Sequence, residues 1–442
     1  MKKKLFLIMI LFIALFPKIN IISVSGNGAG IRIDDVLILF IFISYFRSIF
    51  IDKDYYIESE KFKKIIKIFS FFVLINLIST IVGIALNYVK PLLGILYFAR
   101  KIEYFVMIII TYDVFKRKMV KEESFYKLMT FILFMHLIIS LLQFNGFIGS
   151  FNRGEFVSTM TQGRVSSTFN GAYEFSAFLL LLMPIYLYRT ITLKQYSFIN
   201  ISSLAIIVIC TFLTDSRTSV VVMLIMLFMF LIKEIKNKAI LGLVICIGIL
   251  ITCIYFLFDL NIGNIINNTR FSSVNIDEII NVTKKAWYSK NFDGYLKTGK
   301  WYGEDEIYTS SIAADASYTI RVYHWMQLID GFLRSPIIGV GDSISGGSAD
   351  GNYIRILSES GLLGLLTWIY LLIYIGKSSR GNDLINKNVH YALISIVLGA
   401  FLIDLFEASK IMMFFWVLLG ILLSQDNKEK EKENEFKEYS HS

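Results

Sequence analysis

The sequence is poor in charge, in proline and in histidine. Of its 442 residues, 18% are charged, four are proline and four are histidine, whereas 55% are hydrophobic and the mean hydropathy is +0.61. A soluble globular chain carries roughly 25% charged and about 45–50% apolar residues. The shortage of charge therefore excludes a soluble globular enzyme and a disordered chain, and it indicates a protein built mostly from membrane-spanning helices.

Cysteine is scarce as well. The three cysteines, Cys210, Cys246 and Cys253, all lie within apolar runs and form neither a metal-binding motif nor a disulfide framework. They are expected to be small buried hydrophobic side chains, and no metal or cofactor is predicted. The net charge of +9 is expected to reflect basic cytoplasmic loops, so no nucleic-acid partner is predicted.

Long apolar runs predict about twelve transmembrane helices, because roughly 20 apolar residues cross the hydrocarbon core of a bilayer. The predicted spans are residues 5–24, 34–51, 65–86, 91–112, 125–148, 172–190, 197–214, 218–232, 239–258, 353–375, 389–405 and 410–424. The first run follows three lysines and is expected to be a retained anchor, because no convincing cleavage site follows it. The predicted fold class is an all-α polytopic membrane protein, with spans 1–9 in residues 1–258 and spans 10–12 in residues 353–424.

The segments that connect the spans alternate in charge. Lysine and arginine gather in every second connection, for example at 61–64 and 116–121, while most of the others are short and neutral. The positive-inside rule then places both termini in the cytoplasm. With this orientation, residues 259–352 form one large extracytoplasmic loop between spans 9 and 10, and residues 425–442 form a charged cytoplasmic tail.

The large loop contains a predicted amphipathic helix. Ser317 is expected to be its N-cap, and Pro336 is expected to end it. One side of this helix is a polar arc of His324, Gln327, Asp330 and Arg334, with Arg321 at its edge. The opposite side is apolar, so the helix is expected to lie along the outer membrane interface.

Oppositely charged residues also interrupt the predicted spans, where each charge needs a compensating partner. The pairs at helical spacing are Arg100 with Glu103, Arg355 with Glu359, and Glu407 with Lys410. The spacing predicts that the two members of each pair neutralise one another within one helix.

Four arginines, Arg32, Arg164, Arg217 and Arg321, fall at predicted outer edges of spans, where the positive-inside rule does not explain them. Arg164 lies in GRVSSTFN (163–170), and Arg217 lies in a short turn between two spans, TDSRTS (214–219). A guanidinium group matches the geometry of phosphate oxygens. Convergence of Arg164, Arg217 and Arg321 would therefore make an anion site, whereas snorkelling to the interface explains any single arginine.

Two residues near these arginines are candidates for a catalytic base. His324 follows Arg321 by three residues, and Asp350 stands at the mouth of the tenth span. The sequence does not choose between them, and a structural histidine and a helix N-cap are the respective alternatives. Candidate residues for lining a sugar or acceptor position are Tyr323, Trp325, Asn352 and Tyr353.

Four segments, taken in order, resemble the bacterial O-antigen polymerase (Wzy-type) and O-antigen ligase family of polytopic membrane glycosyltransferases. The segments are residues 163–170, the Ser216-Arg217 turn, the large loop with Arg321 and Trp325, and the series GVG (339–341), NY (352–353) and ESGLLG (359–364). The resemblance covers roughly residues 150–375, and the order of the segments is more specific than any one of them.

The resemblance implies a metal-independent glycosyl transfer at the outer face of the bacterial inner membrane. Donor and acceptor would be glycans linked to undecaprenyl diphosphate in the membrane lipid, and the outer arginines would hold the diphosphate. A chain-length regulator and a flippase are candidate further partners. The product would be an O-antigen, a capsular polysaccharide or an exopolysaccharide.

Polymerase is favoured over ligase, because the ligases tend to carry a histidine beside the asparagine of the last segment. This chain has Asp350-Gly351-Asn352 there. An O-antigen ligase that transfers the chain to lipid A core stays the alternative. A transporter or flippase of lipid-linked sugars is the distant alternative: Arg100, Lys101 and Glu103 would support it, and the lack of a visible internal repeat argues against it.

Overall fold

A computed structural model gives the structure of the chain. It describes residues 2–23, 30–50, 59–152, 155–157, 164–234, 276–290, 292–298, 316–344 and 350–441. Within these ranges the protein is mostly helical, and the strands form two short antiparallel hairpins. β1 (Asn20–Ser23) pairs with β2 (Gly30–Arg32), and β3 (Ser150–Asn152) pairs with β4 (Glu155–Val157).

The helices follow the apolar runs. The first five are α1 (Lys2–Leu15), α2 (Ile33–Phe50), α3 (Glu60–Ala85), α4 (Pro91–Lys116) and α5 (Glu122–Phe144). The next are α6 (Ala172–Leu187), continued by a π-helical turn (Tyr188–Thr192), α7 (Phe198–Leu213) and α8 (Arg217–Glu234). The region of the predicted loop contains α10 (Ile276–Tyr288), α11 (Phe292–Thr298) and α13 (Ala316–Arg334). The last are α14 (Asn352–Ser378), α15 (Leu384–Gly399) and α16 (Ser409–His441).

Four of the described helices are long and apolar enough to cross a membrane: α3, α5, α6 with its π-helical turn, and α14. α7 and residues Ser409–Gln425 of α16 are shorter apolar helices. These helices are those of a mostly α-helical, multi-pass membrane protein. Eleven of the twelve predicted spans overlap a described helix, and span 239–258 lies outside the described residues. The number of spans and the side on which the large loop lies stay predictions.

The first predicted span is too long. α1 ends at Leu15, two residues before Pro17, and residues 20–23 belong to β1. Proline has no N–H and disfavours a helical conformation in the residue before it. With 14 residues, α1 is about 21 Å long, which is shorter than the hydrocarbon core of roughly 30 Å.

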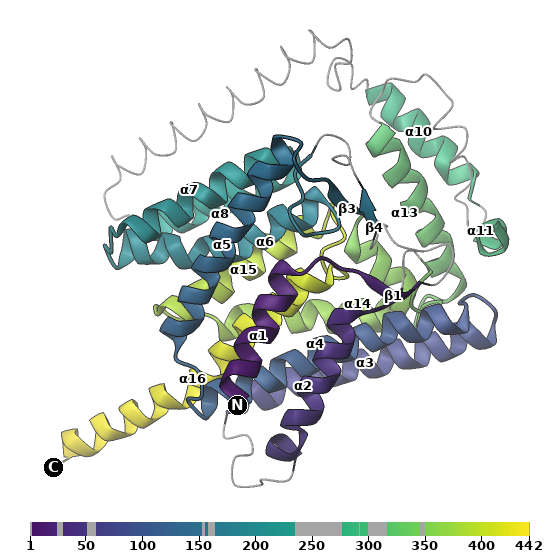
Figure 1. Cartoon of the computed structure of the whole chain (residues 1–442). Coiled ribbons are helices and arrows are strands. Elements are labelled where there is room, and N and C mark those ends of the chain that lie inside the picture. Colours follow the sequence, from purple (N-terminus) through teal and green to yellow (C-terminus); the bar gives the residue numbers. More distant parts are fainter. Residues whose placement is uncertain are drawn as a thin grey trace.

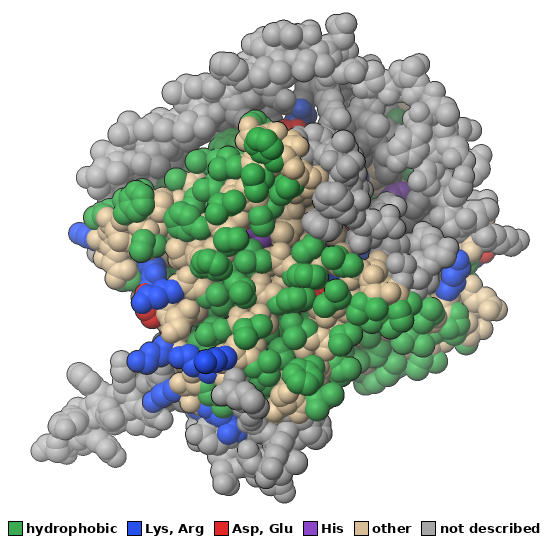
Figure 2. Space-filling view, viewed as in Figure 1, with side chains coloured by type: hydrophobic (Ala, Val, Ile, Leu, Met, Phe, Trp, Pro, Cys, Tyr) green, Lys and Arg blue, Asp and Glu red, His purple; other side chains and the backbone are tan. Residues whose placement is uncertain are grey.

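The two termini lie at the same end of the helical bundle, and the β hairpins and α13 lie away from that end (Figure 1). Figure 2 shows hydrophobic side chains over the broad middle of one face, with Lys and Arg side chains gathered at its edge near the termini. The exposed apolar side chains include Phe40, Ile81 and Leu366, at 57–60% exposure. A soluble protein rarely exposes so large a contiguous apolar surface, so lipid is expected to cover this face.

α14 is broken near its middle, where Gly361 has φ 65° and ψ −168°. Backbone groups of the preceding loop take the place of missing helical partners in four hydrogen bonds at the break. The bonds are Val340 N–H to Ser358 O (3.0 Å), Gly341 N–H to Glu359 O (3.0 Å), Leu362 N–H to Pro336 O (2.9 Å) and Leu363 N–H to Ile337 O (3.2 Å). A Cβ at Gly361 would lie 2.3 Å from the Ile337 carbonyl oxygen, so only glycine fits there.

The predicted amphipathic helix is present as α13. It begins at Ala316, so Ser317 lies inside its first turn and the N-cap prediction is wrong. Both sides of α13 are buried in part: His324 at 9% and Gln327 at 1% exposure belong to the polar arc, Val322 at 3% belongs to the apolar side, and Leu333 at the end of the apolar side is 54% exposed. α13 packs on α14 and on α10, which places this polar arc next to the start of α14.

Candidate functional site

Arg164 lies in the segment that leads into α6. Its Nη1 donates a hydrogen bond to the Tyr173 hydroxyl at 2.9 Å, and its Nε lies 3.6 Å from Oδ2 of Asp215. Asp215 has φ 47° and sits in the tight turn between α7 and α8, two residues before Arg217. The arginine segment and the Arg217 turn are also joined directly, because Val165 N–H donates to Leu213 O at 3.3 Å.

Arg321, on α13, joins the same group from another direction. Its Nε donates to Oδ2 of Asp350 at 2.8 Å, and Trp325 on the next turn donates its indole N–H to the Asp350 carbonyl oxygen. Burial works against the charge of Arg321, but Asp350 first and the Tyr173 hydroxyl second raise its pKa above the ordinary value. Tyr173 is therefore hydrogen-bonded to Arg164 and is an electrostatic neighbour of Arg321.

Three of the predicted site segments thus meet around Tyr173 and Asp215. Arg164 donates to the Tyr173 hydroxyl and contacts the turn that carries Arg217, and Tyr173 is also close enough to Arg321 to influence its pKa. Arg217 is half-buried at the first position of α8. The guanidinium groups of Arg164 and Arg321 lie in this group, each beside a carboxylate, and guanidinium groups are suited to bind an anion with several oxygens.

The two predicted base candidates lie next to Arg321. The Asp350 side chain is 34% exposed and accepts from Arg321, and burial raises its pKa although Arg321 opposes that shift. His324 is one helical turn from Arg321 and is 9% exposed. Asp350 is the more accessible of the two groups.

The four residues predicted to line a sugar position have different surroundings. Asn352 is fully buried: its amide donates to Asp404 and its Oδ1 accepts from Phe406 N–H at 3.0 Å. Tyr323 is 5% exposed within the contact between α10 and α13. Trp325 and Tyr353 are only partly buried, so they are the two that retain surface for a ligand. Contact with sugar stays a prediction for all four.

Only one of the three predicted intrahelical ion pairs forms as predicted. Arg355 lies 3.3 Å from Glu359, and it also binds Asp404 from the turn before α16. Arg100 instead lies 3.7 Å from Asp35 of α2, and this contact replaces the predicted one with Glu103. The prediction considered spacing within one helix only, whereas a neighbouring helix supplies the nearer carboxylate.

The prediction for Glu407 and Lys410 is wrong. α16 begins at Ser409, so Glu407 precedes the helix and the spacing argument does not apply. Lys410 donates to Thr168 O at 2.9 Å and to Ala14 O at 3.3 Å, and Glu407 lies 4.0 Å from Lys101. Lys410 therefore joins the arginine segment to the end of α1.

A second group of charges adjoins the first. Lys18 pairs with Glu174 at 2.8 Å, and Glu174 is the neighbour of Tyr173 in the first turn of α6. Arg32 lies 3.2 Å from both Asp34 and Asp35. Lys18 and Arg32 thus each have a carboxylate partner, as Arg164 has in Asp215 and Arg321 has in Asp350.

Sequence reasoning missed Tyr173 and Asp215. Tyr173 is nine residues from Arg164 and 148 residues from Arg321, so no spacing rule connects it with both. Asp215 carried a weak signal, because it is a charged residue two positions before Arg217 in the short turn between two predicted spans. Among the described residues, no group of three His, Cys, Asp or Glu side chains is arranged to hold a metal ion.

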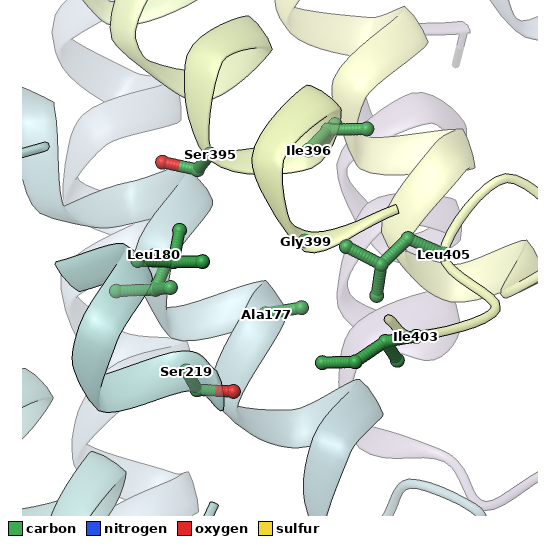
Figure 3. Close-up of a pocket in the computed structure, with 9 residues that line it drawn as sticks. Ala177, Leu180, Ser219, Ser395, Ile396, Gly399, Ile403 and Leu405 are labelled. Carbon is green, nitrogen blue, oxygen red and sulfur yellow. The ribbon is translucent and has the colours of Figure 1, made fainter. Parts of the chain in front are cut away.

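A small cavity lies beneath the Arg217 turn, between α6, α8 and α15 (Figure 3). Its volume is about 10 Å³, and its lining includes Ala177, Ser219, Gly399 and Leu405. This volume is about that of one water molecule. The cavity is therefore a local packing gap and cannot admit a sugar.

Residues 202–369 match the family model of the O-antigen ligases (Wzy_C). The match runs from α7 into α14 and includes Arg217, Arg321 and Asp350, whereas Arg164 and Tyr173 precede it. A search of curated proteins finds no match. The family match confirms the resemblance to the O-antigen polymerase and ligase group, and it supports a role in the assembly of O-antigen-type polysaccharide.

Proposed function

We propose that the protein polymerises oligosaccharide repeat units carried on undecaprenyl diphosphate, at the outer face of the bacterial inner membrane. The observation that carries the proposal is the gathering of three segments: Arg164 bonds to Tyr173 and contacts Asp215 of the Arg217 turn, and Arg321, bonded to Asp350, has Tyr173 as a neighbour. A lipid-linked diphosphate presents the oxygens that such guanidinium groups recognise.

In this reaction an acceptor sugar hydroxyl attacks the anomeric carbon of the donor glycan. The new glycosidic C–O bond forms while the bond from the anomeric carbon to the phosphate oxygen breaks, and undecaprenyl diphosphate leaves with the bonding electrons. The arginines stabilise the charge that develops on the leaving phosphate. Asp350 takes the proton of the acceptor hydroxyl, because it is the more accessible base candidate and it adjoins the proposed leaving-group site.

The direct experiment uses purified protein and one defined undecaprenyl-diphosphate-linked repeat unit. A polymerase is expected to convert it into a ladder of longer lipid-linked glycans without an ion gradient. A ligase would instead need an added lipid A core acceptor and would leave the repeat unit unextended. Failure to join the units under either condition, combined with their movement across a vesicle membrane, would indicate a transporter.

The role of Asp350 gives a pH prediction. A base must be deprotonated to act, so the rate is expected to fall as the pH drops through the Asp350 pKa. Because burial raises that pKa, the acidic limb should lie above the range of an exposed aspartate, which is about 3.9. Asp350→Asn should remove most of the activity, and the activity that remains should no longer show this fall at low pH. If the fall in rate at low pH persisted in Asp350→Asn but disappeared in His324→Gln, the base would be His324.

The proposed membrane orientation is tested with reporter fusions. The alternation of basic connections predicts that both termini are cytoplasmic and that the region 259–352 is extracytoplasmic. Fusions after positions 299 and 429 are therefore expected to report opposite sides of the membrane. Reporters on the same side would contradict the orientation, and would also place the arginine group on the wrong face for a translocated lipid-linked substrate.

A further inference from the structure

The segment that carries Arg164 has no regular secondary structure, yet most of it is buried. Val165, Ser166, Ser167, Thr168 and Phe169 are each 5% exposed or less. A buried irregular segment must find hydrogen-bond partners for its backbone outside helices and strands. The side chains that supply those partners determine where the segment lies, and therefore where Arg164 points.

Gln143, near the end of α5, is the main partner. Its Oε1 accepts from the backbone N–H of Ser167 at 2.7 Å and of Ser166 at 3.2 Å. Its Nε2 donates to Ser167 O at 2.9 Å and to Gly149 O at 3.0 Å. The amide thus uses two acceptor and two donor positions, which is its full capacity, and the side chain is 1% exposed.

The backbone at Ser167 is held in a strained conformation. Its φ is 50°, in the left-handed region that a residue other than glycine adopts only when its surroundings impose it. The Ser167 hydroxyl lies 2.8 Å from Nδ1 of His136, which adds a side-chain contact to the three bonds that Gln143 makes with this turn. Lys410 supports the next residue by donating to Thr168 O at 2.9 Å.

We propose that Gln143 is a positioning residue for Arg164. By fixing the Ser166-Ser167 turn, it holds Arg164 against Tyr173 and keeps Val165 bonded to Leu213, which aligns the segment with the Arg217 turn. The inference rests on the proposed function, because it concerns how the diphosphate site is held in place. Gln143 itself lies below the site and does not touch the arginine.

The test is a double-mutant cycle between Gln143→Leu and Arg164→Ala, read as kcat/KM for polymerisation of the lipid-linked repeat by the purified full-length protein. Displacing a binding group by about 1 Å can lower a rate up to a hundredfold, so Gln143→Leu alone is expected to lower kcat/KM by about ten- to a hundredfold. If Gln143 acts through Arg164, the double variant should equal Arg164→Ala within about twofold.

A purely structural role would give a different result. In that case Gln143→Leu would lower the activity by the same factor in both backgrounds, and the two effects would multiply, which would overturn the inference. Failure of the proposed function is distinguishable, because the wild-type protein would then leave the repeat unit unextended, whereas a wild-type rate in Arg164→Ala would contradict only the role of Arg164. The apparent melting temperature of each variant is measured in the same detergent to normalise the folded fraction.

Two further variants keep the test decisive. Ser167→Ala removes only the hydroxyl contact with His136, and its smaller loss of about two- to fivefold should also vanish in the Arg164→Ala background.

Thr130→Val is the matched control. Thr130 is on the same helix as Gln143, about 20 Å along it, and its hydroxyl lies 3.0 Å from the Tyr186 hydroxyl. This variant should leave kcat/KM unchanged. An equal loss in Thr130→Val and Gln143→Leu would contradict a specific link to Arg164.

Discussion

Replacing Arg321 by alanine is expected to lower glycan polymerisation by about ten- to a few-hundredfold. A hydrogen bond to a charged group is worth about 1.5–3 kcal/mol, and each 1.4 kcal/mol corresponds to about a tenfold change in rate. Arg321 is 18% exposed and is held in place by Asp350, so its guanidinium group is fixed before a ligand binds. Arg164→Ala and Arg217→Ala are expected to show losses in the same range.

Lysine at position 321 should restore only part of the activity. It keeps the positive charge but loses the planar fork that bonds to Asp350 while presenting further N–H groups to a phosphate. Polymerisation is measured in cells by the glycan ladder, with the amount of protein in the membrane matched by immunoblot.

Arg334 provides the control on the same helix. It pairs with Asp293 at 2.5 Å and lies over the Phe292 ring, so it fastens α11 to α13 away from the Tyr173 group. Its side chain is 30% exposed, and the loss of a surface ion pair has a small effect. Arg334→Ala should therefore polymerise almost normally. Normal polymerisation by the alanine variants at 164, 217 and 321 together would refute the diphosphate site.

The helical part of the fold follows from the sequence because apolar runs of sufficient length leave few alternatives in a bilayer. Most predicted spans therefore overlap helices, and the amphipathic helix predicted in the large loop is present as α13. The hydropathy pattern does not show where an apolar run is interrupted. Residues 20–23 are apolar enough to continue a span, yet Pro17 ends the helix and a hairpin follows. Gly361 lies within an apolar run too, and its break depends on a loop that arrives from residues 336–341.

The candidate site was predictable to the extent that it depends on residue type. Arginines at outer edges were singled out individually, and Arg164 and Arg321 do share a neighbour. Their common partner Tyr173 could not be inferred, because the contact depends on how α6 and α13 pack. The ion pairs show the same limit: Arg355 and Glu359 meet because four residues of one helix fix their distance, whereas Arg100 finds Asp35 on another helix.

The buried pair of Lys101 and Asp342 is expected to have the largest effect on stability. Lys101, on α4, lies 2.5 Å from Asp342, in the loop that fills the break of α14. The two side chains are 7% and 0% exposed, and Asp342 N–H also donates to the Thr80 hydroxyl at 3.3 Å. Removing Lys101 leaves Asp342 buried without its partner, which typically costs about 3–5 kcal/mol, and removing Asp342 leaves Lys101 with only the more distant Glu407 at 4.0 Å.

Lys101→Met and Asp342→Asn are therefore each expected to reduce the amount of folded protein in the membrane and to lower its apparent melting temperature in detergent. The double variant removes both charges, so it should recover a large part of the loss, because a neutral pair has no unpaired charge to accommodate. Lys63→Met is the matched control. Lys63 pairs with Glu60 at 3.0 Å on the surface of α3, with the two side chains 49% and 72% exposed, and its loss should cost less than about 1 kcal/mol. Single variants at 101 and 342 that melt at the wild-type temperature would show that the break in α14 is held without this pair, by the four backbone hydrogen bonds of the loop alone.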